Sequence, residues 1–284
     1  MKLLTDLSSL TQWTASCRAA GGEIGFVPTM GALHLGHMAL IHAARKACAH
    51  VVASIFVNPT QFGPNEDFAR YPRTLDQDRQ LLAEAGCDAL FVPEAGEIYP
   101  VGFQTSIHIE LGNSLCGRMR PGHFDGVAVV VTILLNRVRP DVAFFGLKDY
   151  QQFLLIRRLV GDLAMPVRVV GIPTVREADG LAMSSRNRYL TADERQRAGF
   201  LYQALMAARQ AYRQGERDVQ VLEALSRRIL ESGGVDGVEY IELRDAQTLE
   251  PVVVCRDNNA PVMLVAARVG GTRLIDNMVL SIVD

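Results

Sequence analysis

Short apolar runs alternate with amphipathic stretches along the first part of the chain. The apolar runs are rich in β-branched residues and predict buried strands at residues 24–27, 51–57, 89–92, 142–145 and 167–171. Patterns of helical spacing predict helices at residues 38–49, 73–85 and 149–163. Residues 127–138 form a long apolar run that fits a buried helix or strand, and its length favours a helix. Strands that alternate with helices indicate an α/β fold, a Rossmann-like doubly wound parallel sheet with helices on both faces.

The pattern changes beyond Arg176. Two long amphipathic stretches predict helices at residues 191–214 and 219–232, the first opened by a capping box of Thr191 and Glu194. Shorter alternating runs predict antiparallel strands at residues 238–243, 252–254, 262–269 and 272–275, and Asp276 with Asn277 predicts a turn. We therefore expect a catalytic domain at residues 1–174 and a second, smaller α+β lid domain at residues 175–284.

Composition narrows the classes of function. A formal net charge of −2 gives no broad attraction to nucleic acid or to a membrane surface, and no apolar run reaches membrane-spanning length. The five cysteines are dispersed without a C-x-x-C pair, which argues against a zinc site and favours reduced thiols in a cytoplasmic protein.

The segment PTMGALHLGH joins the first of these strands to a helix. A helix N-terminus that follows a glycine-bearing turn presents N–H groups and partial positive charge to an anion. His34 and His37 lie three residues apart and share a face of the first helical turn, where they could donate hydrogen bonds to a reacting phosphate. The same two residues could instead hold a metal with a third ligand, or cap the helix.

Two further polar loops also follow predicted strands. They are FVNPTQF, with the amides of Asn58 and Gln61, and FGLKDYQQ, with Lys148 at a helix N-terminus. Because parallel strands end at one edge of a sheet, we expect these loops and the histidine turn to form one site. The run LAMSSRN concentrates hydroxyls and a guanidinium that suit a triphosphate.

Six motifs occur in the order PTMGALHLGH, FVNPTQF, RYPRTLDQD, RPGHFDGV, FGLKDYQQ and LAMSSRN. Together they resemble the pantothenate synthetase (pantoate–β-alanine ligase) family of the class I nucleotidyltransferase superfamily. The resemblance implies that ATP activates pantoate as pantoyl adenylate with release of pyrophosphate, and that β-alanine then displaces AMP to give pantothenate. It also implies Mg²⁺ as cofactor and a homodimer.

The same resemblance assigns site residues. Those matched to catalysis are His34, His37, Lys148, Ser184, Ser185 and Arg186. Gln61 and Gln152 match the positions that bind pantoate, and Gln61 also matches the position that binds β-alanine. The positions matched to ATP are Met30, Gly31, Ala32, Leu33, His34, Leu35, Gly36, His37, Gly146, Leu147, Lys148, Asp149, Val175, Met183, Ser184, Ser185 and Arg186.

Two positions depart from the family pattern. Leu147 stands where many members carry an acidic residue, and Thr60 stands where many carry methionine. The protein ligands of Mg²⁺ stay unknown, since no set of carboxylates forms a cage, and Asp76 and Asp78 are candidates for outer contacts. The alternatives are a different small nucleotidyltransferase and a non-catalytic nucleotide-binding module; a tRNA synthetase is disfavoured because the chain is short and not basic.

Overall fold

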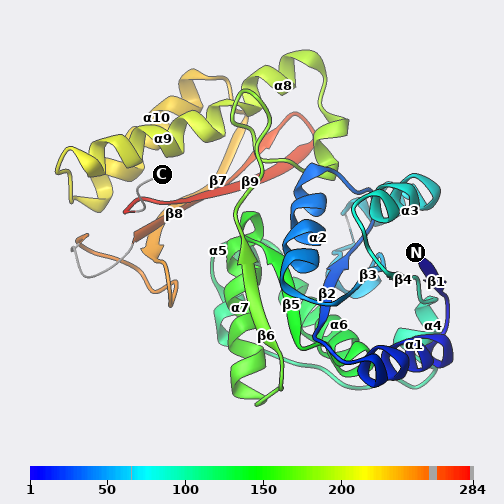
Figure 1. The fold of residues 1–284 in the computed structure, drawn as a ribbon. Coiled ribbons are helices and arrows are strands. Elements are labelled where there is room, and N and C mark those ends of the chain that lie inside the picture. Colours follow the sequence, from blue (N-terminus) through cyan, green and yellow to red (C-terminus); the bar gives the residue numbers. More distant parts are fainter. Residues whose placement is uncertain (65, 256–260, 282–284) are drawn as a thin grey trace. The chain divides into compact units, whose positions relative to one another are not determined.

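The computed structural model describes residues 1–64, 66–255 and 261–281 (Figure 1). Contacts divide the chain into two compact units, which are described separately. The first contains Met1–Leu147 and Leu155–Pro173, and the second contains Lys148–Leu154 and Thr174–Asp284. The division into domains at residues 1–174 and 175–284 stays a prediction; the compact units additionally group Lys148–Leu154 with the second part.

The first unit is built on a six-stranded sheet in the order β1-β4-β3-β2-β5-β6. All of its neighbouring strands pair in parallel. The strands are β1 (Lys2–Leu4), β2 (Ile24–Thr29), β3 (His50–Ile55), β4 (Ala89–Phe91), β5 (Val142–Gly146) and β6 (Arg168–Ile172). The predicted Rossmann-like parallel sheet is confirmed.

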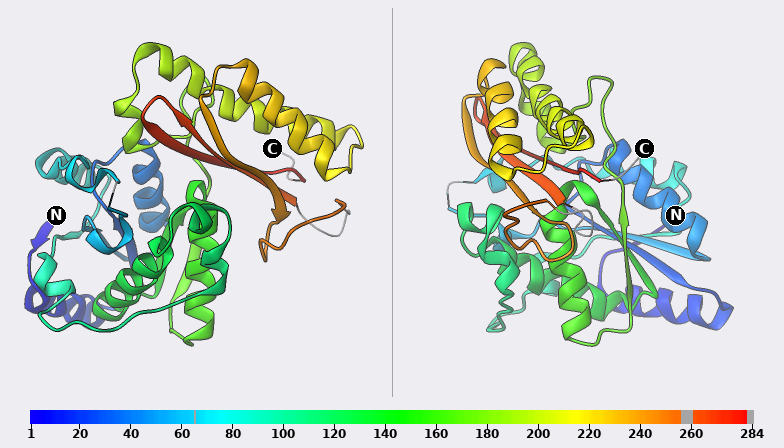
Figure 2. Two further views of the ribbon diagram at one scale, coloured as in Figure 1. Left: turned by 180° about the vertical axis from the view of Figure 1, so that it is seen from behind. Right: turned by 90° about the vertical axis from the view of Figure 1, so that its left-hand side faces the viewer.

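Helices cover this sheet, as the views in Figure 2 show. The helices along residues 1–162 are α1 (Leu7–Ala20), α2 (Leu35–Ala47), α3 (Leu75–Glu84), α4 (Ala95–Ile98), α5 (Leu115–Met119), α6 (His123–Val138) and α7 (Tyr150–Asp162). On one face Val27, Ala53 and Phe144 pack with Ile41 of α2 and Leu82 of α3. Side chains alternate along a strand, and Phe26, Val52 and Ala143 of the opposite face are also buried. The strands therefore lie buried on both faces, which explains their apolar sequences.

The strand order fixes where a ligand site can form. The chain leaves β2 for β3 on one side, whereas β5 pairs with β2 on the other side. Open parallel sheets bind ligands beyond the strand ends at such a switch point. The loops after β2, β3 and β5 emerge at one edge of the sheet, as the sequence predicts.

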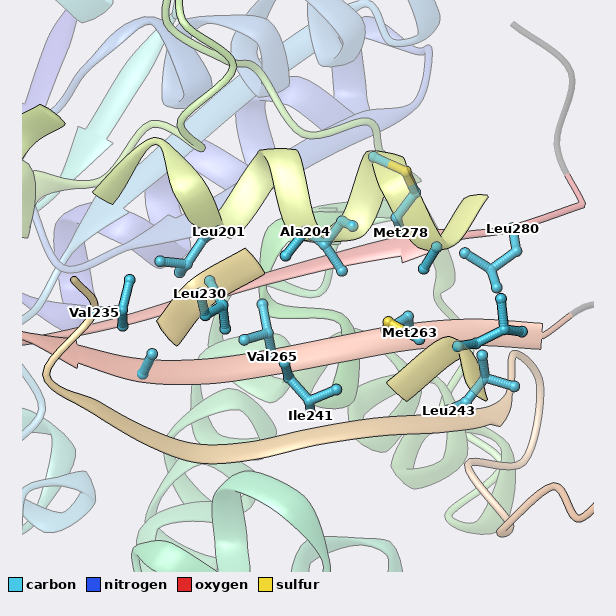
Figure 3. Close-up of a cluster of buried hydrophobic side chains, with 14 of the residues drawn as sticks. Leu201, Ala204, Leu230, Val235, Ile241, Leu243, Met263, Val265, Met278 and Leu280 are labelled. Atoms are coloured by element: carbon cyan, nitrogen blue, oxygen red, sulfur yellow. The ribbon is translucent and has the colours of Figure 1, made fainter. Parts of the chain in front are cut away.

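The second unit contains an antiparallel sheet in the order β7-β8-β9, with helices packed against it. Its elements are α8 (Ala192–Ala198), α9 (Phe200–Arg213), α10 (Val219–Ser232), β7 (Gly237–Asp245), β8 (Pro261–Val269) and β9 (Thr272–Val279). Figure 3 shows apolar side chains of α9, α10 and the sheet meeting in one core, with Leu201, Leu230, Val265 and Met278 among them. The predicted smaller α+β part is confirmed.

Three local predictions are wrong. The helix expected at residues 191–214 is two helices, because Gly199 ends α8 and begins α9. Asp276 and Asn277 lie within β9, and the preceding turn is formed by Gly270 and Gly271. Residues 252–254 form no strand and make only an isolated bridge at Val254. At the N-terminus, β1 and α1 were not predicted.

Candidate active site

The turn after β2 reverses the chain through two residues in the left-handed region. Gly31 has φ +80° and Ala32 has φ +51°, so glycine relieves the strain at the first position and alanine bears it at the second. The hydroxyl of Thr29 accepts a hydrogen bond from the N–H of Gly31 at 3.1 Å and donates to the carbonyl of Ser54 at 2.8 Å. The start of the turn is thereby fixed to the end of β3.

The carboxylate of Asp78 holds the middle of the same turn. Its two oxygens accept hydrogen bonds from the N–H groups of Ala32 at 2.9 Å and Leu33 at 2.8 Å. The hydroxyl of Thr74 donates to it at 3.1 Å, and Asp78 is only 1% exposed. The suggestion that Asp78 makes an outer contact to Mg²⁺ stays a prediction; in this structure the carboxylate accepts hydrogen bonds from the backbone of the turn.

The two histidines cap α2 reciprocally. The Nδ1 atom of His34 accepts the N–H of Gly36 at 3.1 Å, and the Nδ1 atom of His37 accepts the N–H of His34 at 3.3 Å. Their ring centroids lie 4.1 Å apart. A ring nitrogen that accepts a hydrogen bond carries no proton, so the neutral imidazoles are protonated at Nε2. The cap thus selects the tautomer that presents an Nε2–H donor.

Gln61 joins the histidine turn to the loop after β3. Its Nε2 donates to the sulfur of Met30 at 3.2 Å, and its Oε1 accepts from Asn58 at 3.1 Å. Asn58 is 1% exposed, and its oxygen also accepts hydrogen bonds from Tyr99 at 2.8 Å and Thr60 at 3.0 Å. The structure therefore brings Gln61 and Met30 together, while Asn58 shapes the loop.

The segment RPGHFDGV supports the backbone of Gln61. The carbonyl of Gln61 accepts from Arg120 at 3.2 Å and lies 2.7 Å from Nδ1 of His123. Arg120 also pairs with Glu66, its Nε donating at 2.6 Å. Burial acts to raise the pKa of Glu66, but the hydrogen bonds and charge of Arg120 outweigh it, and the pKa lies below its usual range. Gly126 allows α6 to approach this loop closely, since a Cβ there would lie 2.4 Å from the carbonyl oxygen of Thr60.

Lys148, Asp149 and Gln152 follow β5 and belong to the second unit. The Nζ atom of Lys148 lies 4.0 Å from a carboxylate oxygen of Asp149, and Gln152 lies partly buried in the first turn of α7. The side-chain amide of Asn277 donates to the carbonyl of Lys148 at 2.8 Å. The hydroxyl of Tyr150 donates to the carbonyl of Ala246, also at 2.8 Å.

Residues 175–183 form a hairpin that leads through Ser184 into a 3₁₀ helix, η5 (Ser185–Tyr189). The N–H of Met183 donates to the carbonyl of Val175 at 3.0 Å, and Arg176 bridges to Ala182. Ser184 caps η5 by accepting the N–H of Arg186 at 3.3 Å. The predicted residues Val175, Met183, Ser184, Ser185 and Arg186 are therefore held on one folded segment.

Sequence reasoning named Asp78 and Asp276 but missed their roles in bracing these loops. Asp78 shares the buried face of α3 with Leu82, four residues later, so an acid on an apolar helical face was the available signal. Asp276 lies in β9 on the same face as the core residues Leu274 and Met278, which is the equivalent signal in a strand.

Among the described residues, no group of three or more histidine, cysteine, aspartate or glutamate side chains could hold a metal ion. Within the same parts of the chain, none of the helices combines the length and the apolarity that a bilayer span requires. Among those same residues, the histidine pair has no third protein ligand of these types.

The comparison with known families decides between the remaining alternatives. A sequence profile described as pantoate-β-alanine ligase matches residues 2–279. This chain belongs to the pantoate–β-alanine ligase family. The match spans both compact units, so the histidine turn and the second unit are parts of one family architecture.

Relatives in the pantoate–β-alanine ligase family are similar over their whole length. The pantothenate synthetase of Magnetococcus marinus is 55% identical over 283 residues, which cover 99% of this chain and 96% of that protein. The one from Moorella thermoacetica is 48% identical, with complete coverage of both.

Solved structures of the family have a similar fold over the whole chain. The pantothenate synthetase of Thermus thermophilus has a TM-score of 0.93 at 46% identity and 99% coverage of both chains. The enzyme of Francisella tularensis, crystallised with a β,γ-ATP compound and β-alanine, has a TM-score of 0.82 at 37% identity, covering 100% of this chain and 99% of that one.

Proposed function

We propose that the chain joins pantoate to β-alanine in two steps that share an acyl-adenylate intermediate. A carboxylate oxygen of pantoate attacks the α-phosphorus of ATP, and pyrophosphate leaves. The amine of β-alanine then attacks the acyl carbon, loses a proton, and AMP leaves with the oxygen that came from pantoate. The products are pantothenate, AMP and pyrophosphate, and the enzyme needs no covalent nucleophile.

The reciprocal histidine cap is the observation that carries this proposal. Each Nδ1 accepts a backbone N–H, and so each neutral ring keeps its proton on Nε2. Negative charge grows on the phosphate oxygens as pantoate attacks, and N–H donors that are already oriented stabilise it more than they stabilise the ground state. His34 and His37 are thus hydrogen-bond donors to the reacting phosphate.

Lys148 and Arg186 are the proposed cations on the phosphate chain. Lysine acts there as a point charge, whereas the planar guanidinium can bind two oxygens together. Ser184 and Ser185 add hydroxyl donors, and the first-unit residues from Met30 to His37, with Gly146 and Leu147, supply the nucleotide's remaining contacts. Val175, Met183 and Asp149 complete the proposed ATP set.

The amides of Gln61 and Gln152 are the proposed contacts to pantoate, and Gln61 also to β-alanine. An amide both donates and accepts, which suits the hydroxyl groups of pantoate. The Gln61 amide already lies beside Met30, and its backbone carbonyl is held by Arg120 and His123.

Mg²⁺ enters this proposal with the nucleotide. The described residues offer no cluster of three carboxylate or imidazole ligands, so the ion is held mainly by phosphate oxygens and water.

We further propose a homodimer and a cytoplasmic location. All five cysteines are buried free thiols, a state that suits a reducing compartment.

Exchange of labelled pyrophosphate into ATP tests the proposal. The first step alone is reversible, so exchange should require pantoate and Mg²⁺ but not β-alanine. Formation of AMP and pantothenate should require all three substrates. Folded protein that catalyses no pantoate-dependent exchange would refute the acyl-adenylate route.

A further inference from the structure

The strand β9 carries a buried acid on the face that packs into the core of the second unit. The side chain of Asp276 is 0% exposed, and it alternates with the core residues Leu274 and Met278. Burial raises the pKa of Asp276, while the charges of Arg176 and Lys148 act in the opposite direction. A buried ion pair is weak evidence for stability, since an apolar pair of similar size often serves as well. The ion pair between Asp276 and Arg176 therefore points to a role in fixing the position of the segments that it joins.

Asp276 binds one of the two loops that carry the proposed phosphate ligands. Arg176 donates to both carboxylate oxygens, at 2.6 and 3.0 Å. The same guanidinium donates to the carbonyl of Gly180 at 3.0 Å and lies over the ring of Tyr202 at 4.5 Å. Arg176 is also the residue that bridges to Ala182. The base of the hairpin before Ser184 is thereby tied to β9.

Asn277 binds the other loop. Its side-chain amide donates to the backbone carbonyl of Lys148 at 2.8 Å, and its own N–H donates to the Asp276 carboxylate at 2.8 Å. Asn277 is 8% exposed, so water competes little for this contact. Two consecutive residues of one strand thus hold two segments that lie far apart in the sequence.

We propose that Asp276 and Asn277 are positioning residues that set Lys148 and the segment before Arg186 in register with each other. The inference rests on the proposed function, since it takes Lys148 and Arg186 as the phosphate cations. Asn277 fixes the backbone at Lys148, and Asp276 acts through Arg176 on the hairpin. Asn277 sets the place of Lys148, and Asp276 sets that of the segment before Arg186.

The same strand offers a matched control. Arg273 pairs with Glu239 of β7 at 2.7 Å, and the two side chains are 17% and 10% exposed. Arg268 of β8 is a second partner of Glu239, so all three residues of this cluster lie in the three-stranded sheet. Glu239→Gln therefore removes a partly buried ion pair from the same sheet, away from the two contacts that β9 makes with the loops.

The test compares Asn277→Ala, Asp276→Asn and Glu239→Gln by steady-state kinetics, ATP titration calorimetry and thermal unfolding of the full chain. Misplacement of a cation predicts that Asn277→Ala weakens ATP binding and lowers kcat/KM for ATP about ten- to hundredfold. KM for pantoate and for β-alanine should stay within about twofold. Glu239→Gln should lower Tm and leave every KM unchanged.

A purely structural role would move Tm and the active fraction but not the affinity for ATP. Asn277→Ala with wild-type ATP affinity would overturn the inference, and this variant decides the matter if Asp276→Asn fails to fold. Failure of the proposed function has a different signature: wild-type protein would then catalyse no pantoate-dependent exchange. In that case ATP affinity in Asn277→Ala still decides whether β9 positions the nucleotide ligands.

Discussion

Replacement of Asp78 tests whether one buried carboxylate holds the histidine turn. The carboxylate accepts two backbone N–H groups and a hydroxyl, and it lies beside two residues with positive φ. Backbone in this conformation persists only where its surroundings impose it. Loss of the carboxylate should therefore both destabilise the first unit and displace the cap at His34, the residue that follows Leu33.

The magnitude follows from the hydrogen bonds. One bonded to a charged group contributes about 1.5–3 kcal/mol, and a buried N–H left unpaired costs about 1–3 kcal/mol. Asp78→Asn keeps one carbonyl acceptor but sets an NH₂ against the second N–H, so it should lower the free energy of unfolding by about 2–3 kcal/mol. Asp78→Ala leaves two buried N–H groups unpaired and should cost about 2–6 kcal/mol.

The chain provides both a reporter and a control. Trp13, the single tryptophan, lies buried in α1 of the first unit, so its fluorescence during urea unfolding reports that unit. Asp76 lies two residues earlier on α3 with its side chain 100% exposed. Asp76→Asn should change the free energy of unfolding by less than about 0.5 kcal/mol.

Turnover supplies the second measurement. A displacement of catalytic donors by about 1 Å can cost about a hundredfold in rate, so folded Asp78→Asn should lose activity of that order. If Asp78→Asn unfolds at the same urea concentration as Asp76→Asn and keeps its turnover, the reasoning about the turn is refuted.

Three further predictions concern the same unit. His37→Ala should lower turnover by about 10²–10³, as loss of a preoriented donor does, and an unchanged rate would reject its catalytic role. Gln61→Ala should raise KM for pantoate while calorimetry finds ATP binding unchanged; equal loss of ATP affinity would contradict the assignment. Glu66 has a lowered pKa, so its pairing with Arg120 stabilises the fold above the ordinary carboxyl pKa and is lost as pH falls through the folded value. Glu66→Gln should lower the free energy of unfolding near neutral pH by about 1–3 kcal/mol. As the pH is lowered, the urea midpoint of this variant should fall less steeply than that of the wild type; an equally steep fall would contradict the prediction.

The sequence predicts the parallel sheet well because its strands are buried on both faces. A run such as residues 51–57 has few alternatives to a central strand, and the loops after β2, β3 and β5 follow from strand direction alone. The helix after the glycine-bearing turn was predicted at residues 38–49, and it begins three residues earlier, at Leu35, with His34 as its N-cap.

Contacts between distant residues explain what was missed. Asp276 and Asn277 have the local chemistry of a turn, but Arg176, a hundred residues away, and the carbonyl of Lys148 hold them in a strand. Similarly, α8 and α9 look like one amphipathic helix until Gly199 separates them. The bracing role of Asp78 could not be predicted from its neighbours in the sequence, because its two backbone partners lie more than forty residues earlier.

Transfer of oxygen-18 from the pantoate carboxylate tests the acyl-adenylate claim most directly. Because the attacking carboxylate oxygen stays on phosphorus when the amine displaces AMP, doubly labelled pantoate should yield AMP with one labelled oxygen and pantothenate that retains the other. Mass spectrometry of the products measures both. Unlabelled AMP, or label in inorganic phosphate or pyrophosphate, would contradict the account.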